Sequence, residues 1–170
     1  WAVYYDKGPV AIRYPRGISY SFQFSPRNSF PINFGKGELL KQGKDVTIAS
    51  IGYMSNIALE AASFLKKDGI DAEVINARFI KPLDIELIVE SILKTGRLFT
   101  IEEGALSGGF GSGVLELIID KVKKHIIIKN IALPDKFIEH GDRALLLDKY
   151  ELSSEKIAET IKNNYGKDKN

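Results

Sequence analysis

The sequence contains no cysteine among its 170 residues. This absence excludes disulfide bonds, thiolate zinc sites and cysteine nucleophiles, and it says nothing about the redox compartment. The two histidines, His125 and His140, do not have the spacing of paired metal ligands, so we expect structural or solvated side chains and no metal site. No apolar run approaches the roughly 20 residues that span a bilayer, and we therefore expect no membrane partner.

The charges of the chain are almost balanced, with 24 basic and 22 acidic residues and a formal net charge of +2. Because the two signs are interspersed, no long cationic face is available to neutralise a nucleic-acid backbone, and we expect no nucleic-acid partner. The length allows one sizeable domain and a remnant of another. The chain begins at Trp1 instead of methionine, so we expect a fragment of a longer polypeptide.

From about residue 36 onward, strand and helix patterns alternate along the sequence. The predicted strands cover residues 35–44, 46–52, 72–76, 98–103 and 126–132, the first as a short edge strand or hairpin arm. Between them the apolar residues follow helical spacing, with helix starts marked by Asp84 and Ser153. This alternation predicts an α/β domain with a mainly parallel sheet covered on both faces.

The stretch from 18 to 33 follows neither periodicity and contains two prolines among serines and aromatics. Such a composition is typical of a linker between domains. We therefore expect residues 1–17 to end a preceding domain and residues 34–165 to form a complete one. The polar tail, 166–170, is expected to be disordered.

An apolar triplet followed by two arginines stands near the beginning, in GPVAIRYPRG (residues 8–17). Residues 10–12 predict a buried strand, and Arg13 and Arg16 would lie at its carboxyl end, where open α/β sheets hold ligands. A guanidinium group suits a phosphate because its planar fork reaches two oxygens at once. The alternative is a pair of arginines that make surface or interdomain salt bridges.

Two acidic residues and a glycine-rich loop follow the strand predicted at 98–103. Paired carboxylates such as Glu102 and Glu103 can perform acid–base chemistry, but their position before a helix favours stabilisation by its dipole and free amides, so neither is assigned a catalytic role. SGGFGSG (107–113) contains no G-x-G-x-x-G frame. Its helix terminus suits an anion, whereas close packing of helix on strand is the structural alternative.

The chain resembles the carboxy-terminal part of the 1-deoxy-D-xylulose-5-phosphate synthase family, thiamine diphosphate enzymes of the transketolase group. The likeness begins at GPVAIRYPRG and continues through IGYMSNIALEAASFLKKDGIDAEVINARFIKPLD (51–84), IEEGALSGGFGSGVLE (101–116) and IALPDKFIEHGDRALLLDKYELSSEKIAETI (131–161). It implies the carboxy-terminal transketolase fold, a three-layer α/β/α sandwich around a five-stranded, mostly parallel mixed sheet. It also implies a cytoplasmic homodimer that condenses pyruvate with glyceraldehyde 3-phosphate, with loss of CO2, for isoprenoid, thiamine and pyridoxal synthesis.

The same resemblance assigns one site residue and excludes several others. Arg16 matches the family arginine that binds the phosphate of the aldehyde substrate, whereas no binding role is carried over to Arg13. The family anchors thiamine diphosphate through Mg²⁺ with a GDG sequence, which is absent here, and its activating glutamate lies upstream. We therefore expect the fragment to bind no cofactor, to be inactive alone, and to have the remaining domains of the same polypeptide as partners.

Two other readings remain open from the sequence. The carboxy-terminal domain of a 2-oxo acid dehydrogenase beta subunit, which docks an acyltransferase, shares the same sandwich and the EEG pattern. It is disfavoured by YPRG at the beginning and LPDKFIEHG near the end, which resemble the synthases. A small stand-alone nucleotide-binding α/β protein is disfavoured because the chain lacks a phosphate-binding loop.

Overall fold

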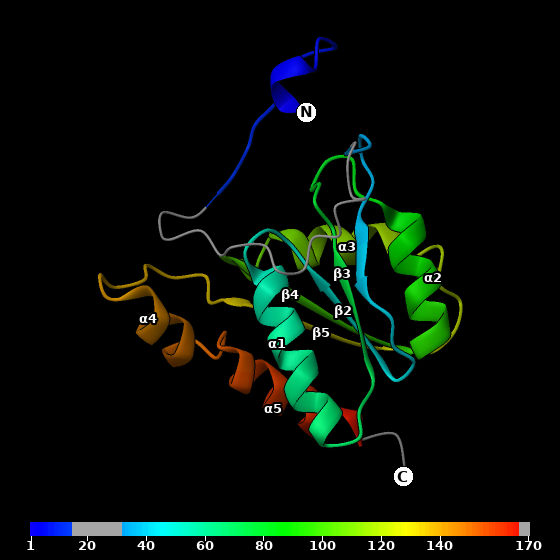
Figure 1. Ribbon diagram of the computed structural model, residues 1–170, viewed down its shortest axis with the longest axis vertical. Helices are drawn as coiled ribbons and strands as arrows, with labels where there is room; N and C mark the ends of the chain where they lie inside the picture. The colour runs from blue at the N-terminus through cyan, green and yellow to red at the C-terminus, as the bar shows by residue number, and fades with distance from the viewer. Residues whose placement is uncertain (15–31, 167–170) are drawn as a thin grey trace.

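A five-stranded sheet forms the centre of the computed structural model, which describes residues 1–14 and 32–166 (Figure 1). The strand order is β1-β3-β2-β4-β5, with β1 antiparallel to β3 and the other neighbours parallel. The strands are β1 (Glu38–Lys41), β2 (Val46–Ser50), β3 (Ala72–Asn76), β4 (Arg97–Ala105) and β5 (Ile127–Leu133). The predicted mixed, mostly parallel sheet is therefore confirmed.

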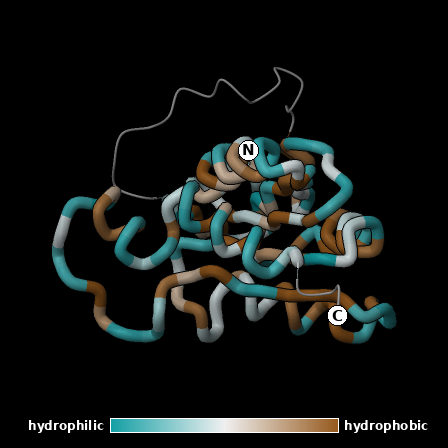
Figure 2. The backbone as a smooth tube through the Cα atoms, turned by 90° about the horizontal axis from the view of Figure 1, so that it is seen from below, coloured by the Kyte–Doolittle hydropathy of each residue, from teal (hydrophilic) through white to brown (hydrophobic). Residues whose placement is uncertain are grey.

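Helices cover both faces of this sheet, which confirms the three-layer arrangement. The apolar cluster on one face contains residues of α1 (Met54–Lys67) and α5 (Ser154–Tyr165), whereas the cluster on the other contains residues of α2 (Ile85–Thr95) and α3 (Phe110–Ile118). A short helix, α4 (Arg143–Lys149), lies beside the sandwich (Figure 1). Figure 2 shows apolar and polar stretches alternating along the tube, as expected for helices that bury one side.

Strand β2 shows why the sheet must be covered by helices on both faces. All five of its residues are buried. Val46 and Ile48 belong to the cluster beneath α1 and α5, whereas Ala49 belongs to the cluster beneath α2 and α3. The hydroxyl of Thr47 also points to the α2 face, where it lies 2.6 Å from Ser91 Oγ and 2.7 Å from Thr95 Oγ1. A continuous buried run of this kind is typical of a parallel strand covered on both faces.

The predicted helix starts have different chemistry in the structure. Asp84 caps α2 as expected, and its carboxylate also accepts a hydrogen bond of 3.1 Å from the Gly37 amide, which joins α2 to the beginning of β1. Ser153 occupies the capping position of α5, but its hydroxyl donates to the Asp148 carboxylate at 2.9 Å instead of capping the helix.

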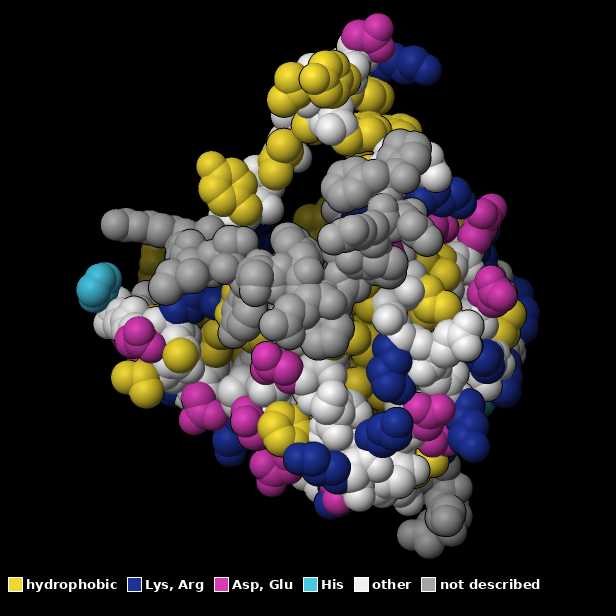
Figure 3. Space-filling model, viewed as in Figure 1, with side chains coloured by type: hydrophobic (Ala, Val, Ile, Leu, Met, Phe, Trp, Pro, Cys, Tyr) yellow, Lys and Arg dark blue, Asp and Glu magenta, His cyan; other side chains and the backbone are white. Residues whose placement is uncertain are grey.

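The buried strand predicted at residues 10–12 is wrong for this chain. The segment is irregular, with Val10 40% and Ile12 66% exposed. In Figure 1 the blue N-terminal segment stands away from the sheet over most of its length, and Figure 3 shows hydrophobic side chains exposed at the top of the molecule. A strand needs a neighbour to pair its backbone and cover its apolar face, and no described residue pairs with this segment as a strand partner.

Several sequence predictions fall outside the described residues. These are the phosphate role of Arg16, almost all of the linker at 18–33, and the tail beyond residue 166. Helix α4, in contrast, was not predicted. It begins where the Asp142 carboxylate accepts the amides of Ala144 and Leu145, and it buries Leu147 alone, so its apolar pattern is weak.

The buried hydroxyl cluster under α2 predicts a measurable loss of stability in Thr47→Val. The change leaves Ser91 and Thr95 without a shared partner in a site closed to water, which should lower the free energy of unfolding by about 1–3 kcal/mol. Ser63→Ala removes an exposed hydroxyl that bonds only the Leu59 carbonyl. This control should change the free energy of unfolding by less than about 0.5 kcal/mol. Urea denaturation of both variants measures the difference, and equal midpoints would contradict the prediction.

Candidate functional site at the carboxyl edge of the sheet

The strand order reverses between β2 and β4, at the centre of the sheet. The chain leaves β2 through α1 toward β3, and it leaves β4 through α3 toward β5 on the opposite side. Ligands of open α/β sheets bind at the carboxyl ends of strands where the order reverses in this way. Tyr53 follows β2 at this edge, and Glu102 and Glu103 lie near the end of β4.

Glu102 forms the buried side of the edge. It is 4% exposed, and its two oxygens accept the amides of Phe110 at 2.9 Å and Gly111 at 2.8 Å, at the beginning of α3. These amides are among those that a helix leaves unpaired, and the helix dipole favours a negative charge there. The Glu102 carboxylate therefore lies at the amino terminus of α3 and stabilises it. It occupies the place that an anionic ligand would take.

The glycine-rich turn around Glu102 is needed for close packing. A Cβ atom at Gly109 would lie 2.3 Å from the Ala105 carbonyl and 2.5 Å from Glu102 Oε2. One at Gly104 would also lie 2.5 Å from the same carboxylate oxygen. The loop at 107–113 thus encloses a carboxylate of the chain itself, so a phosphate there would meet a buried negative charge.

Glu103 points to a different partner, Arg143 at the beginning of α4. Arg143 Nε donates to Oε1 at 2.9 Å and Nη2 donates to Oε2 at 2.5 Å, a two-pronged ion pair with both side chains about one-third exposed. The guanidinium carbon also lies 3.8 Å from the centre of the Tyr53 ring. The hydrogen bonds to Glu103 raise the pKa of Arg143, and they occupy both oxygens of the Glu103 carboxylate.

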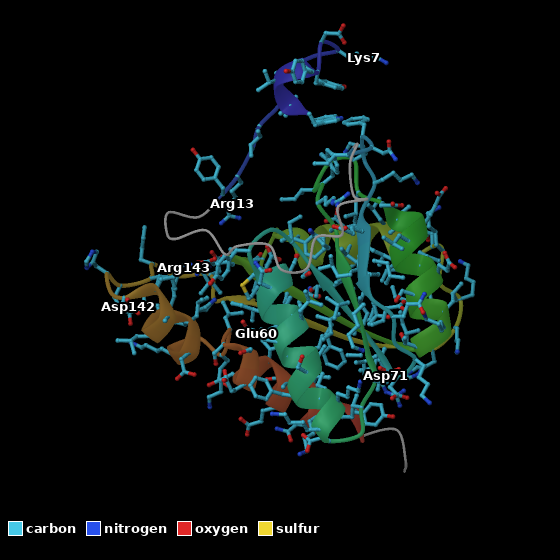
Figure 4. All side chains as sticks on the ribbon, in the orientation of Figure 1. Lys7, Arg13, Glu60, Asp71, Asp142 and Arg143 are labelled. Carbon is cyan, nitrogen blue, oxygen red and sulfur yellow. The ribbon has the colours of Figure 1, made fainter. Side chains whose placement is uncertain are left out.

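Arg13 reaches the same place from the N-terminal segment. Its Nη2 donates to the backbone carbonyl of Glu103 at 2.8 Å, and Figure 4 shows Arg13 and Arg143 near the same edge. The pairing of β2 with β4 ends at Ile101, which leaves the Glu103 carbonyl open to a side-chain donor. The structure thus shows Arg13 in a hydrogen bond between two segments of the chain, and the salt bridge considered from the sequence is not the contact it makes among the described residues.

A second contact holds the other end of the N-terminal segment. The ring of Trp1 stacks on Phe34 with centres 5.6 Å apart and meets the edge of Phe79 at 5.4 Å. Tyr5 also stacks on Trp1 and Phe34. Phe79 follows β3 and Glu103 lies near the end of β4, so the aromatic cluster and the Arg13 contact are both at the carboxyl ends of parallel strands.

The described residues contain no cluster of side chains of the kinds that commonly hold a metal ion. Within residues 1–14 and 32–166, no group of three or more histidine, cysteine or acidic side chains is arranged to hold a metal ion. His125 and His140 are both exposed and belong to different loops. In the same part of the chain, no helix has the length and apolar content needed to cross a membrane.

The family model for the transketolase carboxy-terminal domain matches residues 35–157. The chain belongs to this family. The matched range contains all five strands and the Glu102, Glu103 and Arg143 contacts, whereas Arg13 precedes it. The family assignment therefore agrees with the fold and places the N-terminal segment outside the matched domain.

Curated relatives are similar to almost the whole chain. The 1-deoxy-D-xylulose-5-phosphate synthase of Heliobacterium modesticaldum is 46% identical over 153 residues, which cover 89% of this chain and 23% of the relative. That of Caldanaerobacter subterraneus is 45% identical over 157 residues, covering 92% and 25%. The chain thus spans about a quarter of the length of these relatives.

A solved structure shows the same fold at substantial identity. It is described as a split gene transketolase in an inactive beta4 tetramer, and it is 39% identical to this chain with a TM-score of 0.71. The match covers 76% of this chain and 42% of the other.

Two glycines of the α3 region predict opposite effects of the same substitution. Gly109→Ala should destabilise the domain by about 2 kcal/mol or more, because the new methyl group would collide with a carbonyl and with the Glu102 carboxylate. Gly113→Ala lies within the helix and faces open space, so it should stabilise the domain by about 0.5–1 kcal/mol. Denaturant unfolding of both variants measures the signs. A neutral Gly109→Ala would contradict the packing described for this turn.

Glu139, in the loop before α4, predicts an acid-sensitive contact. Hydrogen bonds from Lys149 and the Tyr150 hydroxyl lower its pKa from 4.5 to about 2. Because the folded-state pKa is lowered, the contact stabilises this region above pH 4.5 and is lost as the pH falls toward 2. Titration of the Glu139 carboxyl followed by NMR should show this shift. Titration of Glu139 near pH 4.5 would refute the contact.

Proposed function

We propose that this chain is the carboxy-terminal part of a thiamine diphosphate-dependent 1-deoxy-D-xylulose-5-phosphate synthase. The whole enzyme condenses pyruvate with glyceraldehyde 3-phosphate and releases CO2. The observation that carries the proposal is the identity of 42–47% to synthases across about nine-tenths of this chain. The match is not confined to the sandwich shared by the wider transketolase group. No observation on the structure favours the dehydrogenase beta subunit.

The proposed domain division follows the sequence boundaries. Residues 1–17 end the preceding pyrimidine-binding domain, 18–33 connect the domains, and 34–165 form the carboxy-terminal domain. Two observations support this division. The family match begins at residue 35, and residues 1–14 contribute no strand to the sheet.

Cofactor chemistry belongs to other parts of the polypeptide in this proposal. Thiamine diphosphate with Mg²⁺ supplies the carbanion chemistry of the whole enzyme. The described residues offer no metal site, and the helix terminus that suits an anion already holds Glu102. The whole enzyme is proposed to be a cytoplasmic homodimer, and the chain alone to bind no cofactor and to have no synthase activity.

Arg16 is the proposed substrate-binding residue of this chain. Its guanidinium would hold the phosphate of glyceraldehyde 3-phosphate by parallel charge-assisted hydrogen bonds. Holding the phosphate also fixes the position of the carbonyl carbon at the other end of this short substrate. The support for this role is the RYPRG motif together with the synthase relatives.

In the full-length synthase, Arg16→Ala should raise the KM for glyceraldehyde 3-phosphate roughly ten- to a hundredfold. A charge-assisted hydrogen bond contributes about 1.5–3 kcal/mol, and each 1.4 kcal/mol is about tenfold in affinity. The KM for pyruvate should be nearly unchanged, and Arg16→Lys should recover part of the loss because it keeps the charge without the fork. Steady-state kinetics with both substrates provide the measurement.

An aldehyde substrate without a phosphate is the control for this variant. Its turnover should be the same with arginine or alanine at position 16. If Arg16→Ala slowed both aldehydes equally, a structural role would replace the phosphate-binding role.

A further inference from the structure

We infer that Arg13, docked on the Glu103–Arg143 pair, is a latch by which the carboxy-terminal domain positions the substrate-binding segment of the synthase. The inference rests on the proposed function, because the segment is the one that carries Arg16. It assigns Arg13, Glu103 and Arg143 as positioning residues that do not touch substrate. It also gives the carboxy-terminal domain a part in substrate affinity.

The contact of Arg13 is specific in its geometry. The guanidinium donates to the Glu103 carbonyl at 2.8 Å, and its Nη1 would lie 3.5 Å from a Cβ atom at Gly104. A contact of this length is ordinary van der Waals distance, so the planar group of Arg13 lies directly beside the Gly104 backbone. A charged donor on a carbonyl oxygen makes one of the stronger hydrogen bonds available to a surface arginine.

The receiving end of the latch is held rigidly from three elements. Arg143 of α4 donates two hydrogen bonds to the Glu103 carboxylate. The same guanidinium stacks on the ring of Tyr53, which follows β2. The neighbouring Glu102 fixes the same backbone to α3. The Glu103 carbonyl is thus presented to Arg13 in a defined direction.

The latch acts on Arg16 through the length of the chain. Arg16 stands three positions after Arg13, so their Cα atoms lie at most about 11 Å apart. Apart from the aromatic contacts at Trp1 and Tyr5, the segment has little to hold it, since Val3 and Tyr4 are 92% and 90% exposed. Fixing Arg13 restricts where Arg16 can lie, and such preorganisation improves affinity by reducing the entropy lost on binding.

The test compares Arg13→Met with Lys7→Met in the full-length synthase. Both remove one positive charge from the same exposed segment, but Lys7 has no partner among the described residues and lies far from Arg13 in Figure 4. Arg13→Met should raise the KM for glyceraldehyde 3-phosphate about three- to tenfold, with kcat and the kinetics of a phosphate-free aldehyde unchanged. Lys7→Met should match the unaltered enzyme. An unchanged KM in Arg13→Met would overturn the latch.

Arg143→Gln separates a latch from a second phosphate ligand. Releasing Glu103 should produce a similar phosphate-selective rise in KM, and the double variant should be no worse than Arg13→Met because both changes break one connection. The latch would be refuted if the effects of Arg13→Met and Arg143→Gln on the KM added fully in the double variant and Arg13→Met raised the KM as much as Arg16→Ala. Arg13 would then be a phosphate ligand.

Hydrogen exchange distinguishes failure of the latch from failure of the proposed function. Amides of residues 8–14 should exchange faster in Arg13→Met than in Lys7→Met. If Arg16→Ala is phosphate-selective while Arg13→Met changes neither KM nor exchange, the latch alone is wrong. If Arg16→Ala shows no phosphate selectivity, the proposed phosphate role fails, and unchanged exchange in Arg13→Met would then refute the docking as well.

Discussion

The carboxylate of Glu102 determines how the end of β4 is built. It lies buried between the strand and the amino terminus of α3, where it accepts two backbone amides that the helix leaves unpaired. Gly104 and Gly109 have no side chains because that carboxylate occupies the space beside them. The direction of α3, the path of the glycine turn and the position of the next residue, Glu103, all depend on this arrangement.

Adjacent residues of a strand point to opposite faces, and this explains the different roles of the two glutamates. Glu102 faces α3, whereas Glu103 faces the side of Tyr53 and α4, where Arg143 neutralises it. The two carboxylates therefore do not share a site. A pair that resembles an acid–base dyad in the sequence is instead two structural contacts on two sides of the sheet.

The carboxyl edge of the sheet serves as a docking surface in this domain. Open α/β sheets commonly hold ligands at such an edge, at the point where strand order reverses. Here Arg143 and Glu102 already occupy the positions near β2 and β4, and the N-terminal segment contacts the edge through Trp1 and Arg13. In this domain, contacts between segments of the chain occupy the edge at which other open α/β sheets bind a ligand.

The sequence by itself determined an α/β domain with a mainly parallel sheet covered on both faces, because periodicity and capping are local properties. The strand prediction at 72–76 matches β3, and Asp84 begins α2 as its side chain indicates. The short helix α4 was not predicted, because a single buried leucine gives no periodic pattern. The one local signal for this helix is its capping residue, Asp142.

Only the tertiary structure decided the contacts of the site and the state of the N-terminal segment. The residues at 10–12 have the composition of a buried strand, but a strand forms only where a neighbour pairs with it. The grouping of Tyr53, Glu103 and Arg143 joins positions up to 90 residues apart, as does the contact of Arg13 with Glu103. Such proximity depends on strand order and chain crossovers, which are set by long-range packing and leave no local trace in the sequence.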